Sequence, residues 1–164
     1  MADIYKSVEW AVQVAEDDSH GYDQENRNGP DYDCSSFVST ALNKGGFNIS
    51  PYSWTGNMVS QLKNDGFYEV PINGERQLGD VFIHEEHHVV MCVDAHRIVQ
   101  ASINEKGGIK NGEKGDQTGR EIYVGTFYHP YYGWQYHLRP PKSAYKHESL
   151  EEQKQTKEFT IIWR

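Results

Sequence analysis

The order in which hydrophobic patterns follow one another predicts an α+β fold for this chain. Up to Gly66, apolar residues recur at helical spacing in three segments. Beyond Gly66, the pattern changes to short runs rich in Val, Ile and aromatic residues, which are typical of strands. Because the helices precede the strands instead of alternating with them, we expect N-terminal helices packed on an antiparallel sheet of five or six strands.

The first helix is expected directly after Asp3, which can act as its N-cap. Residues 17–33 are then polar, aperiodic and rich in Gly, Asn and Asp, so they are expected to form a long loop. Loops of this length in compact domains tend to be functional. The apolar residues that fall on one face of the first helix are Ile4, Val8, Ala11, Val12 and Ala15.

Two shorter helices follow the loop. One is expected over residues 34–44, with Asp33 as its N-cap and a pair of glycines ending it. The other follows Thr55. The strand-like runs after it are residues 81–84, 88–94, 98–103, 120–128 and 134–139, with a glycine-rich loop over 106–119.

The C-terminal segment differs in composition from the rest. Residues 142–157 are charged and nearly devoid of large apolar side chains, which is typical of a linker or a solvated tail. Residues 158–164 are apolar enough to dock as a strand or to begin another module. We therefore expect one domain over residues 1–141 and a linker or tail over residues 142–164.

Composition and charge exclude several classes of function. The 164 residues carry a formal net charge of −8, and no basic stripe is visible of the kind that nucleic-acid binding requires. The acidic charge also disfavours an anionic membrane as a partner. The aromatic content is led by 11 tyrosines, which suit a groove for sugars or peptides but equally suit half-buried positions on a sheet.

The sequence also predicts where the chain is made. No run of residues approaches the apolar length of a membrane span. The N-terminus lacks the basic region and apolar core of a secretion signal. We therefore expect that the chain is made in a cytoplasm or reaches its target by another route. Two cysteines give no disulfide framework, and a reducing compartment would keep both as thiols.

Cys34 is the candidate nucleophile, because it lies where the long loop becomes a helix. Backbone N–H groups and the helix dipole at such a position can stabilise a thiolate and lower the thiol pKa. A cysteine so placed can attack a carbonyl, and the same N–H groups can hold the resulting oxyanion. The alternative is a small buried residue that merely starts a helix.

His88 and Gln100 are the candidate base and its orienting partner. His88 opens a strand whose other residues are apolar, and Gln100 lies on the next strand. A tight hairpin centred on Asp94 would set Gln100 directly opposite His88, where the side chains can meet. The amide carbonyl could then accept from one ring nitrogen and leave the other nitrogen free as a base. A lone strand histidine, in contrast, is usually a structural residue.

Two possible metal sites were weighed, and neither is favoured. The run from His84 to His88 matches the HExxH pattern of zinc proteases, which requires both histidines on one face of a helix. The flanking residues are β-prone, so a strand–turn–strand is expected there instead. The acidic loop 17–33 lacks the alternating acidic positions of an EF-hand. We therefore predict no catalytic metal and no cofactor.

These residues resemble a known family. Asp33-Cys34-Ser35 followed by Phe37 is similar to the cysteine motif of NlpC-type peptidoglycan hydrolases. The strand that begins at His88 resembles the histidine strand of that family, and the family's third catalytic position falls on Gln100. The fit is closer to the phage-endolysin amidase branch, through the runs at residues 18–22, 29–36 and 115–121.

The resemblance implies a papain-like arrangement and a substrate. It implies that Cys34, His88 and Gln100 are catalytic and that Tyr22, Asp33 and Ser35 border the substrate. The substrate would be bacterial peptidoglycan. In this chain Ser36 replaces a glycine common in the superfamily, and Gln100 replaces a histidine that is frequent at the third position.

The resemblance also implies a route to the substrate. A phage lysin is held in the host bacterial cytoplasm until it is released to the cell wall, which fits a chain without a signal peptide. Because this chain is acidic, a separate cell-wall-binding domain or subunit would have to supply adhesion to an anionic wall. A bacterial effector or toxin hydrolase is the alternative among enzymes, and an inactive wall-binding module is the alternative from another class.

The bond that is cut is left open between two amides. The endolysin branch is mostly assigned to the bond between muramic acid and L-alanine, whereas the broader superfamily cuts the stem peptide after D-glutamate or D-glutamine. The tyrosine-bearing loop 17–33 and the aromatic run 127–134 could stack on a sugar. No arginine except Arg27 and Arg97 lies near the candidate residues in sequence, so a carboxylate clamp is not obvious. The muramoyl–alanine bond is therefore favoured.

Overall fold

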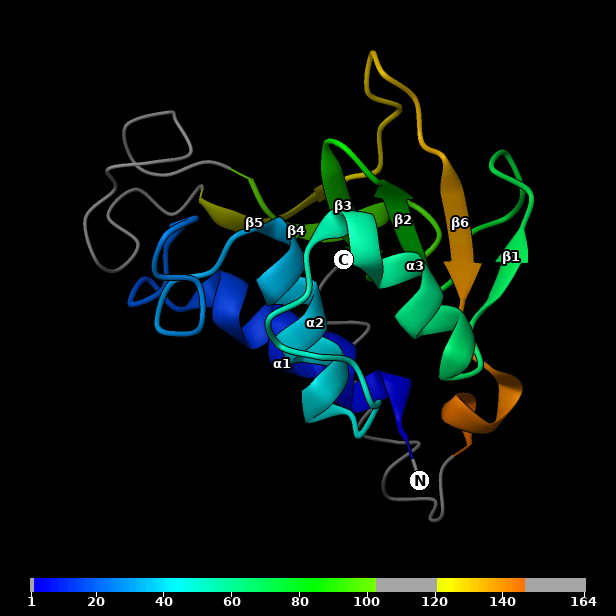
Figure 1. Cartoon of the computed structure of the whole chain (residues 1–164), viewed down its shortest axis with the longest axis horizontal. Coiled ribbons are helices and arrows are strands. Elements are labelled where there is room, and N and C mark those ends of the chain that lie inside the picture. Colours follow the sequence, from blue (N-terminus) through cyan, green and yellow to red (C-terminus); the bar gives the residue numbers. More distant parts are fainter. Residues whose placement is uncertain (1, 103–120, 147–164) are drawn as a thin grey trace.

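A computed structural model of the chain describes residues 2–102 and 121–146 (Figure 1). Three helices come first and six strands follow, so the α+β prediction is confirmed. The elements are α1 (Ile4–Glu16), α2 (Cys34–Lys44), α3 (Thr55–Asn64), β1 (Tyr68–Val70), β2 (Val81–His84), β3 (His88–Cys92), β4 (Arg97–Ala101), β5 (Ile122–Thr126), β6 (Tyr136–Arg139) and the 3₁₀ helix η1 (Lys142–Tyr145).

The six strands form one antiparallel sheet in the order β1-β6-β2-β3-β4-β5. The helices α1 and α2 pack on β3, β4 and β5, while α3 contacts β2. Figure 1 shows all three helices on one side of the sheet. The turn between β2 and β3 and the long connection between β5 and β6 project at the same end of the sheet, the top of the view.

The helix starts and most strands lie where the sequence predicts them. The side chain of Asp3 accepts a hydrogen bond from the Tyr5 backbone at 2.9 Å, and Asp33 caps α2. The strand β1 was missed, because three residues at a sheet edge with Glu69 exposed carry no hydrophobic alternation. The strand β6 starts at Tyr136 rather than at Trp134, whose indole N–H instead donates to the Tyr128 carbonyl at 3.0 Å.

Two apolar clusters stabilise the two faces of the sheet. The larger one lies between the helices and the sheet and includes Val89 and Met91 of β3. The smaller one contains Val90 and Cys92 of the same strand, which point to the opposite face because side chains alternate along a strand. The remaining buried members of the smaller cluster are Phe82, Ile98 and Trp134.

Asp80, which immediately precedes β2, is the centre of a buried polar network. Its carboxylate is fully buried and lies 2.6 Å from His137 Nε2, and Arg139 donates to it from Nε at 3.0 Å and from Nη2 at 2.9 Å. The other ring nitrogen of His137 lies 2.9 Å from the Pro71 carbonyl. This network ties the turn before β2 to β6.

The glycine before Asp80 allows the close approach of α1 to this turn. Gly79 has a φ of +90°, and a Cβ at this position would overlap the side chain of Ile4. A larger residue would therefore strain the backbone and displace the start of α1.

The first residues of the predicted linker or tail pack on the domain. Ala144 in η1 is buried, and the Tyr145 hydroxyl donates to the Leu78 carbonyl at 2.6 Å. The ring of Tyr145 also meets that of Tyr5 edge-on at 5.9 Å. Residues 147–164 lie outside the described part of the chain, so the boundary at residue 141 stays a prediction.

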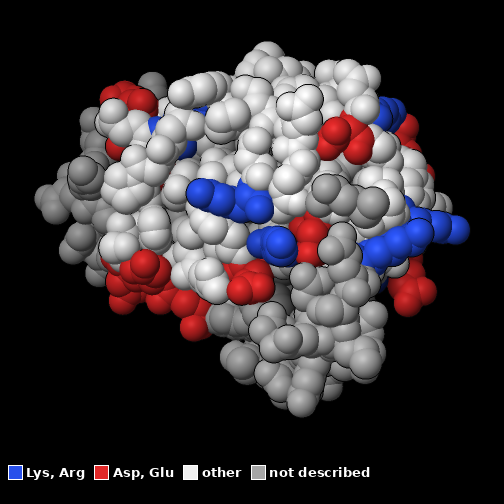
Figure 2. All heavy atoms as spheres, turned by 90° about the horizontal axis from the view of Figure 1, so that it is seen from below, with Lys and Arg blue, Asp and Glu red and all other residues white. Residues whose placement is uncertain are grey.

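The charged side chains on the face seen in Figure 2 are of mixed sign. Lysine and arginine lie between acidic residues and uncharged surface, without gathering into a stripe. Within residues 2–102 and 121–146, no helix has both the length and the apolar character needed to cross a bilayer.

The Asp80 network should contribute strongly to stability. Asp80→Ala leaves His137 and Arg139 without their shared acceptor in a buried place, and breaking such a buried pair typically costs about 3–5 kcal/mol. Urea unfolding followed by circular dichroism measures this loss. The matched control is Glu69→Ala, which breaks the exposed pair between Lys63 and Glu69 and should leave the midpoint almost unchanged. Equal midpoints for the two variants would contradict the assignment.

Candidate active site

Cys34 is the first residue of α2, and its position is fixed by Asp33. The Asp33 side chain accepts from the Ser36 N–H at 2.9 Å, and the Ser36 hydroxyl accepts from the Asp33 N–H at 3.0 Å. This reciprocal cap defines where the helix begins. The N–H of Cys34 belongs to the first turn, where backbone donors have no partner within the helix.

Cys34 is held as a neutral thiol rather than as a thiolate. Burial, and then the charge of Asp33, raise its pKa to about 12, although hydrogen bonds from the Val89 and Ser35 backbone and the charge of Arg27 act in the opposite direction. The Ser35 N–H at the helix N-terminus lowers the pKa as expected, but burial and Asp33 outweigh it, so the predicted net lowering of the pKa is wrong. The thiol is 9% exposed, and the cost of desolvating a thiolate exceeds what the helix end provides.

His88 and Gln100 contact each other through their side chains. His88 Nε2 lies 2.7 Å from Gln100 Oε1. The amide of Gln100 is held in turn, since its Nε2 donates to the Tyr123 hydroxyl at 2.8 Å and its Oε1 accepts from the Tyr128 hydroxyl at 3.0 Å. With Nε2 donating to Gln100, the Nδ1 of a neutral His88 keeps a lone pair and can accept a proton.

The predicted pairing of these two strands, from which the contact was inferred, is wrong because the centre of the hairpin is displaced by one residue. Met91 is opposite Val99 and Cys92 is opposite Ile98, so the hairpin is centred on Ala95 instead of Asp94. Gln100 is therefore a diagonal neighbour of His88. The contact still forms because long side chains reach diagonal partners on the same face of a sheet.

His88 is also held in its neutral form. Burial lowers its pKa from the ordinary value of 6.5, and the hydrogen bond with Gln100 only partly opposes this effect. A thiol with a raised pKa and an imidazole with a lowered pKa rest as an uncharged pair. If the thiol is to act as a nucleophile from this state, the imidazole has to accept the thiol proton during the attack.

The candidate residues lie at the rim where the two apolar clusters meet. By strand alternation, His88 shares the face of Val90 and Cys92 and not the face that packs on the helices. Cys34 belongs to the helix side, yet it accepts a hydrogen bond from the backbone of Val89, the residue after His88. The electrostatic influence of Cys34 also reaches Tyr132, whose pKa is raised to about 12 by burial, by Tyr128 and by Cys34.

Three further residues were predicted to border the substrate, and all lie around Cys34. Tyr22 is 3% exposed, and its pKa is raised by burial and then by the nearby Cys34 and Asp33. Ser35 is buried beside Cys34 and accepts a hydrogen bond from Arg27 Nη2 at 2.9 Å. Whether these residues touch substrate stays a prediction.

Arg27 fastens the loop 17–33 beside Cys34, a role that the sequence did not reveal. Its Nη2 donates to Ser35 and to the Ser53 carbonyl. Its Nε lies 2.9 Å from Asp33 Oδ2 in an ion pair, although the N–H is not aimed at that oxygen. The guanidinium is thus already engaged within the protein.

The HExxH run forms a hairpin, as expected, and not a helix. His84 ends β2 and His88 begins β3, and the two are paired across the turn. His84 and His87 have ring centroids 4.5 Å apart. In residues 2–102 and 121–146, no group of three or more potential ligands from His, Cys, Asp and Glu is arranged to hold a metal ion.

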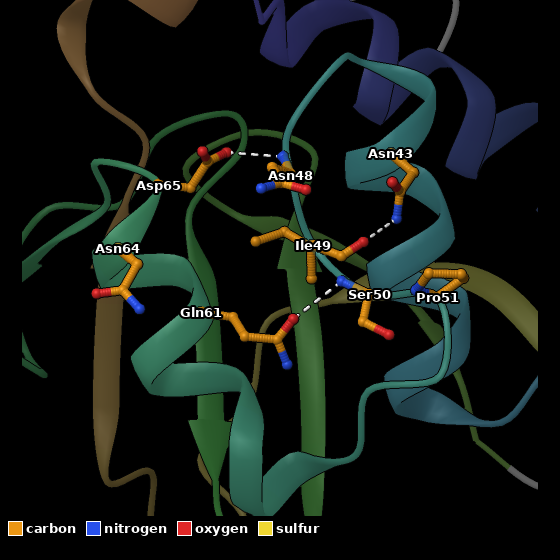
Figure 3. A pocket seen from close by; sticks show the side chains of 8 residues that line it. All are labelled: Asn43, Asn48, Ile49, Ser50, Pro51, Gln61, Asn64 and Asp65. Atoms are coloured by element: carbon orange, nitrogen blue, oxygen red, sulfur yellow. Dashed lines mark hydrogen bonds between the residues drawn. The ribbon is translucent and has the colours of Figure 1, made fainter.

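A polar cavity of about 430 Å³ lies at the other end of α2 (Figure 3). Its amide side chains mostly serve the adjacent loop, since Asn43 donates to the Ile49 carbonyl and Gln61 Oε1 accepts from the Ser50 N–H at 2.9 Å. Asn43 is nine residues after Cys34, which corresponds to roughly 14 Å along the helix. This cavity is therefore separate from the candidate active site.

Other residues of the site were missed for identifiable reasons. Tyr123 is opposite Gln100 in the pairing of β4 with β5, so the correct register of these strands would have revealed it. Trp134 stacks on His88 at 6.2 Å, with ring planes 23° apart. Tyr128 and Trp134 belong to an irregular connection, where periodicity predicts no direction for a side chain.

Comparison with known proteins gives one match. Residues 98–158 match a family described as endolysin-like domain, which is less than half of the 164 residues. A search of the curated proteins found no match. The family match supports an endolysin-type relationship and suggests a phage endolysin-type hydrolase of the cell wall, with peptidoglycan as its substrate. It covers Gln100 and the aromatic connection before β6 but neither Cys34 nor His88.

The pH dependence of activity should report on the contact between His88 and Gln100. His88 accepts a proton only when it is neutral, so cell-wall clearing should fall as the pH drops through its pKa, which lies below 6.5. Gln100→Glu places a carboxylate on the ring, favours the imidazolium, and should move this loss to higher pH by about one pH unit. Gln100→Leu removes the hydrogen bond without adding charge and should lower the maximal rate without that upward move.

Ring titration of His88 by NMR checks the same point independently of lysis. An unchanged His88 titration in Gln100→Glu would contradict the geometry.

Proposed function

We propose that this chain is the catalytic domain of a phage-type endolysin that hydrolyses an amide bond of bacterial peptidoglycan by Cys/His catalysis. The observation that carries the proposal is the contact between His88 Nε2 and Gln100 Oε1 at 2.7 Å. Cys34 lies nearby at the start of α2, and the backbone N–H of Val89, the residue after His88, acts on its thiol. The match over residues 98–158 supports the same class of substrate.

In the proposed mechanism, Cys34 attacks the amide carbonyl as His88 Nδ1 removes the thiol proton. The backbone N–H of Cys34 stabilises the oxyanion, since it has no partner within the helix. His88 then gives its proton to the leaving amine, and a thioester remains. A water molecule, deprotonated by His88, hydrolyses the thioester and restores the thiol. Gln100 keeps the ring oriented throughout.

The neighbouring residues would shape the pocket without taking part in proton transfer. Tyr22 and Ser35 would line it, and Asp33 would act through the cap and through Arg27. The chain would be held in the host cytoplasm and reach the wall after the membrane is breached. A separate wall-binding domain or subunit would supply adhesion, because a net charge of −8 gives this chain no attraction to an anionic wall.

The proposed bond is the one between N-acetylmuramic acid and L-alanine. A cut after D-glutamate or D-glutamine would call for a cation or donor near the nucleophile to hold the free carboxyl group. The arginine nearest to Cys34 in sequence is already engaged by Ser35, Ser53 and Asp33. The stem-peptide endopeptidase is therefore the second candidate and not the first.

The nucleophile can be tested with the two cysteines as a matched pair. Cys34→Ala should lower the rate of cell-wall clearing by at least about a thousandfold, because the covalent step is lost. Cys92→Ala should keep most of the activity, since Cys92 is fully buried in the smaller cluster. Turbidity of purified cell walls measures both, and melting curves check folding. Near wild-type clearing by Cys34→Ala would refute the mechanism.

The bond can be tested from the products. Complete digestion of cell wall followed by labelling of new amino termini should yield alanine, and mass spectrometry should find glycan strands free of peptide. New termini on lysine or another diamino acid would instead assign the enzyme to the endopeptidases.

A further inference from the structure

A row of aromatic rings in mutual contact leads from His88 to the protein surface. Trp134 stacks on His88 at 6.2 Å, and Tyr132 meets Trp134 edge-on at 6.0 Å. His87 stacks on Tyr132 at 4.4 Å with planes 22° apart, and Tyr131 meets Tyr132 at 5.2 Å. These five rings, which we call the aromatic strip, come from the turn between β2 and β3, from the first residue of β3 and from the connection before β6.

Exposure increases along the aromatic strip. Trp134 is 6% exposed, Tyr132 is half-buried, and Tyr131 at the far end is 95% exposed. A tyrosine that is almost fully solvated adds little to folding through burial. Adjacent exposed aromatic rings in such a place are typical of a surface that binds a partner or ligand.

The aromatic strip is held by hydrogen bonds from rigid elements. Gln135 Oε1 accepts from the Glu85 N–H at 2.8 Å, and the Thr55 hydroxyl at the start of α3 donates to the Glu85 carbonyl at 2.7 Å. The Trp134 indole is fastened to the Tyr128 carbonyl. The turn backbone and the Trp134 indole are therefore held in place before a ligand arrives, which lowers the entropic cost of binding.

The charges around the aromatic strip indicate the class of ligand. The strip contains no lysine or arginine, and Glu85 and Glu86 lie in the turn that carries His87. Carboxylates at this place repel a polyanion such as a phosphate-bearing wall polymer. Flat ring faces with phenol and imidazole groups at their edges instead suit an uncharged sugar, whose C–H face stacks and whose hydroxyl and acetamido groups accept or donate hydrogen bonds.

We propose that the aromatic strip is a glycan subsite that binds N-acetylated hexosamine units of the substrate. The inference rests on the proposed function and deepens it, because it assigns the sugar side of the reacting amide to the turn between β2 and β3 and to the connection before β6. The peptide side then faces α2 and the loop 17–33. Tyr131 and Tyr132 are binding residues, separate from the proton transfers at Cys34 and His88.

The test uses the full chain with Cys34→Ala, so that binding is measured without turnover. The probe is a soluble tetramer of N-acetylglucosamine, followed by isothermal calorimetry and by NMR shifts of the Trp134 indole. Adding Tyr131→Ala should weaken binding about two- to tenfold, the loss expected for one stacking contact. Tyr131→Phe keeps the stacking ring and loses only the hydroxyl, so it should weaken binding less than Tyr131→Ala.

The matched control is Tyr68→Ala on the edge strand β1, which removes another exposed tyrosine outside the strip and should change nothing. A free stem peptide serves as the second probe, and its binding should be equal in all variants. Absence of saturable tetramer binding, equal affinity in Tyr131→Ala, or weakened binding of the stem peptide alone would each overturn the glycan subsite. Failure of the proposed chemistry would appear separately, as wall clearing by Cys34→Ala.

Discussion

The burial of Cys34 and His88 in their uncharged forms is the constraint on which the candidate site depends. Desolvation raises the pKa of the thiol and lowers that of the imidazole, and both shifts oppose the separation of charge between them. A site of this kind cannot rely on a standing thiolate. In the proposed mechanism, reactivity therefore comes from a proton transfer that accompanies attack, to an imidazole ring that Gln100 already orients.

This constraint explains why a neutral side chain is suited to the position of Gln100. A carboxylate there would favour the imidazolium and so remove the lone pair that accepts the thiol proton in the proposed mechanism. The amide accepts a hydrogen bond without adding charge. Its own orientation is fixed by Tyr123 and Tyr128, so three neutral groups determine which nitrogen of His88 is free.

The sequence predicted the helices well because their ends carry local chemistry. Asp3 and Asp33 are caps that can be recognised from a few neighbouring residues, and the start of α2 places Cys34 without reference to the rest of the fold. The contact of His88 with Gln100 was predicted from a register that is one turn residue off. The contact forms because the two side chains point to the same face of the sheet in the predicted register and in the observed one.

What the sequence could not predict depends on contacts between distant segments. The raised pKa of Cys34 follows from its burial against β3, which no local pattern reveals. This burial outweighs the lowering of the pKa by the N–H groups at the helix end. Arg27 lies in an aperiodic loop, and its partner Ser53 is 26 residues away. Asp80 looks like a turn residue because its partners His137 and Arg139 are more than 55 positions later.

The candidate site lies at the rim of the sheet because its residues belong to opposite faces, each covered by one of the two apolar clusters. A helix residue such as Cys34 and a residue on the far face of a strand such as His88 can approach each other only where the sheet ends, since elsewhere the strands separate them. The turn between β2 and β3 and the connection before β6 project at that same end (Figure 1). Loop residues with few packing contacts therefore surround the buried residues of the candidate site. Changes in the loops can therefore alter what is bound while the buried pair and its amide partner stay as they are.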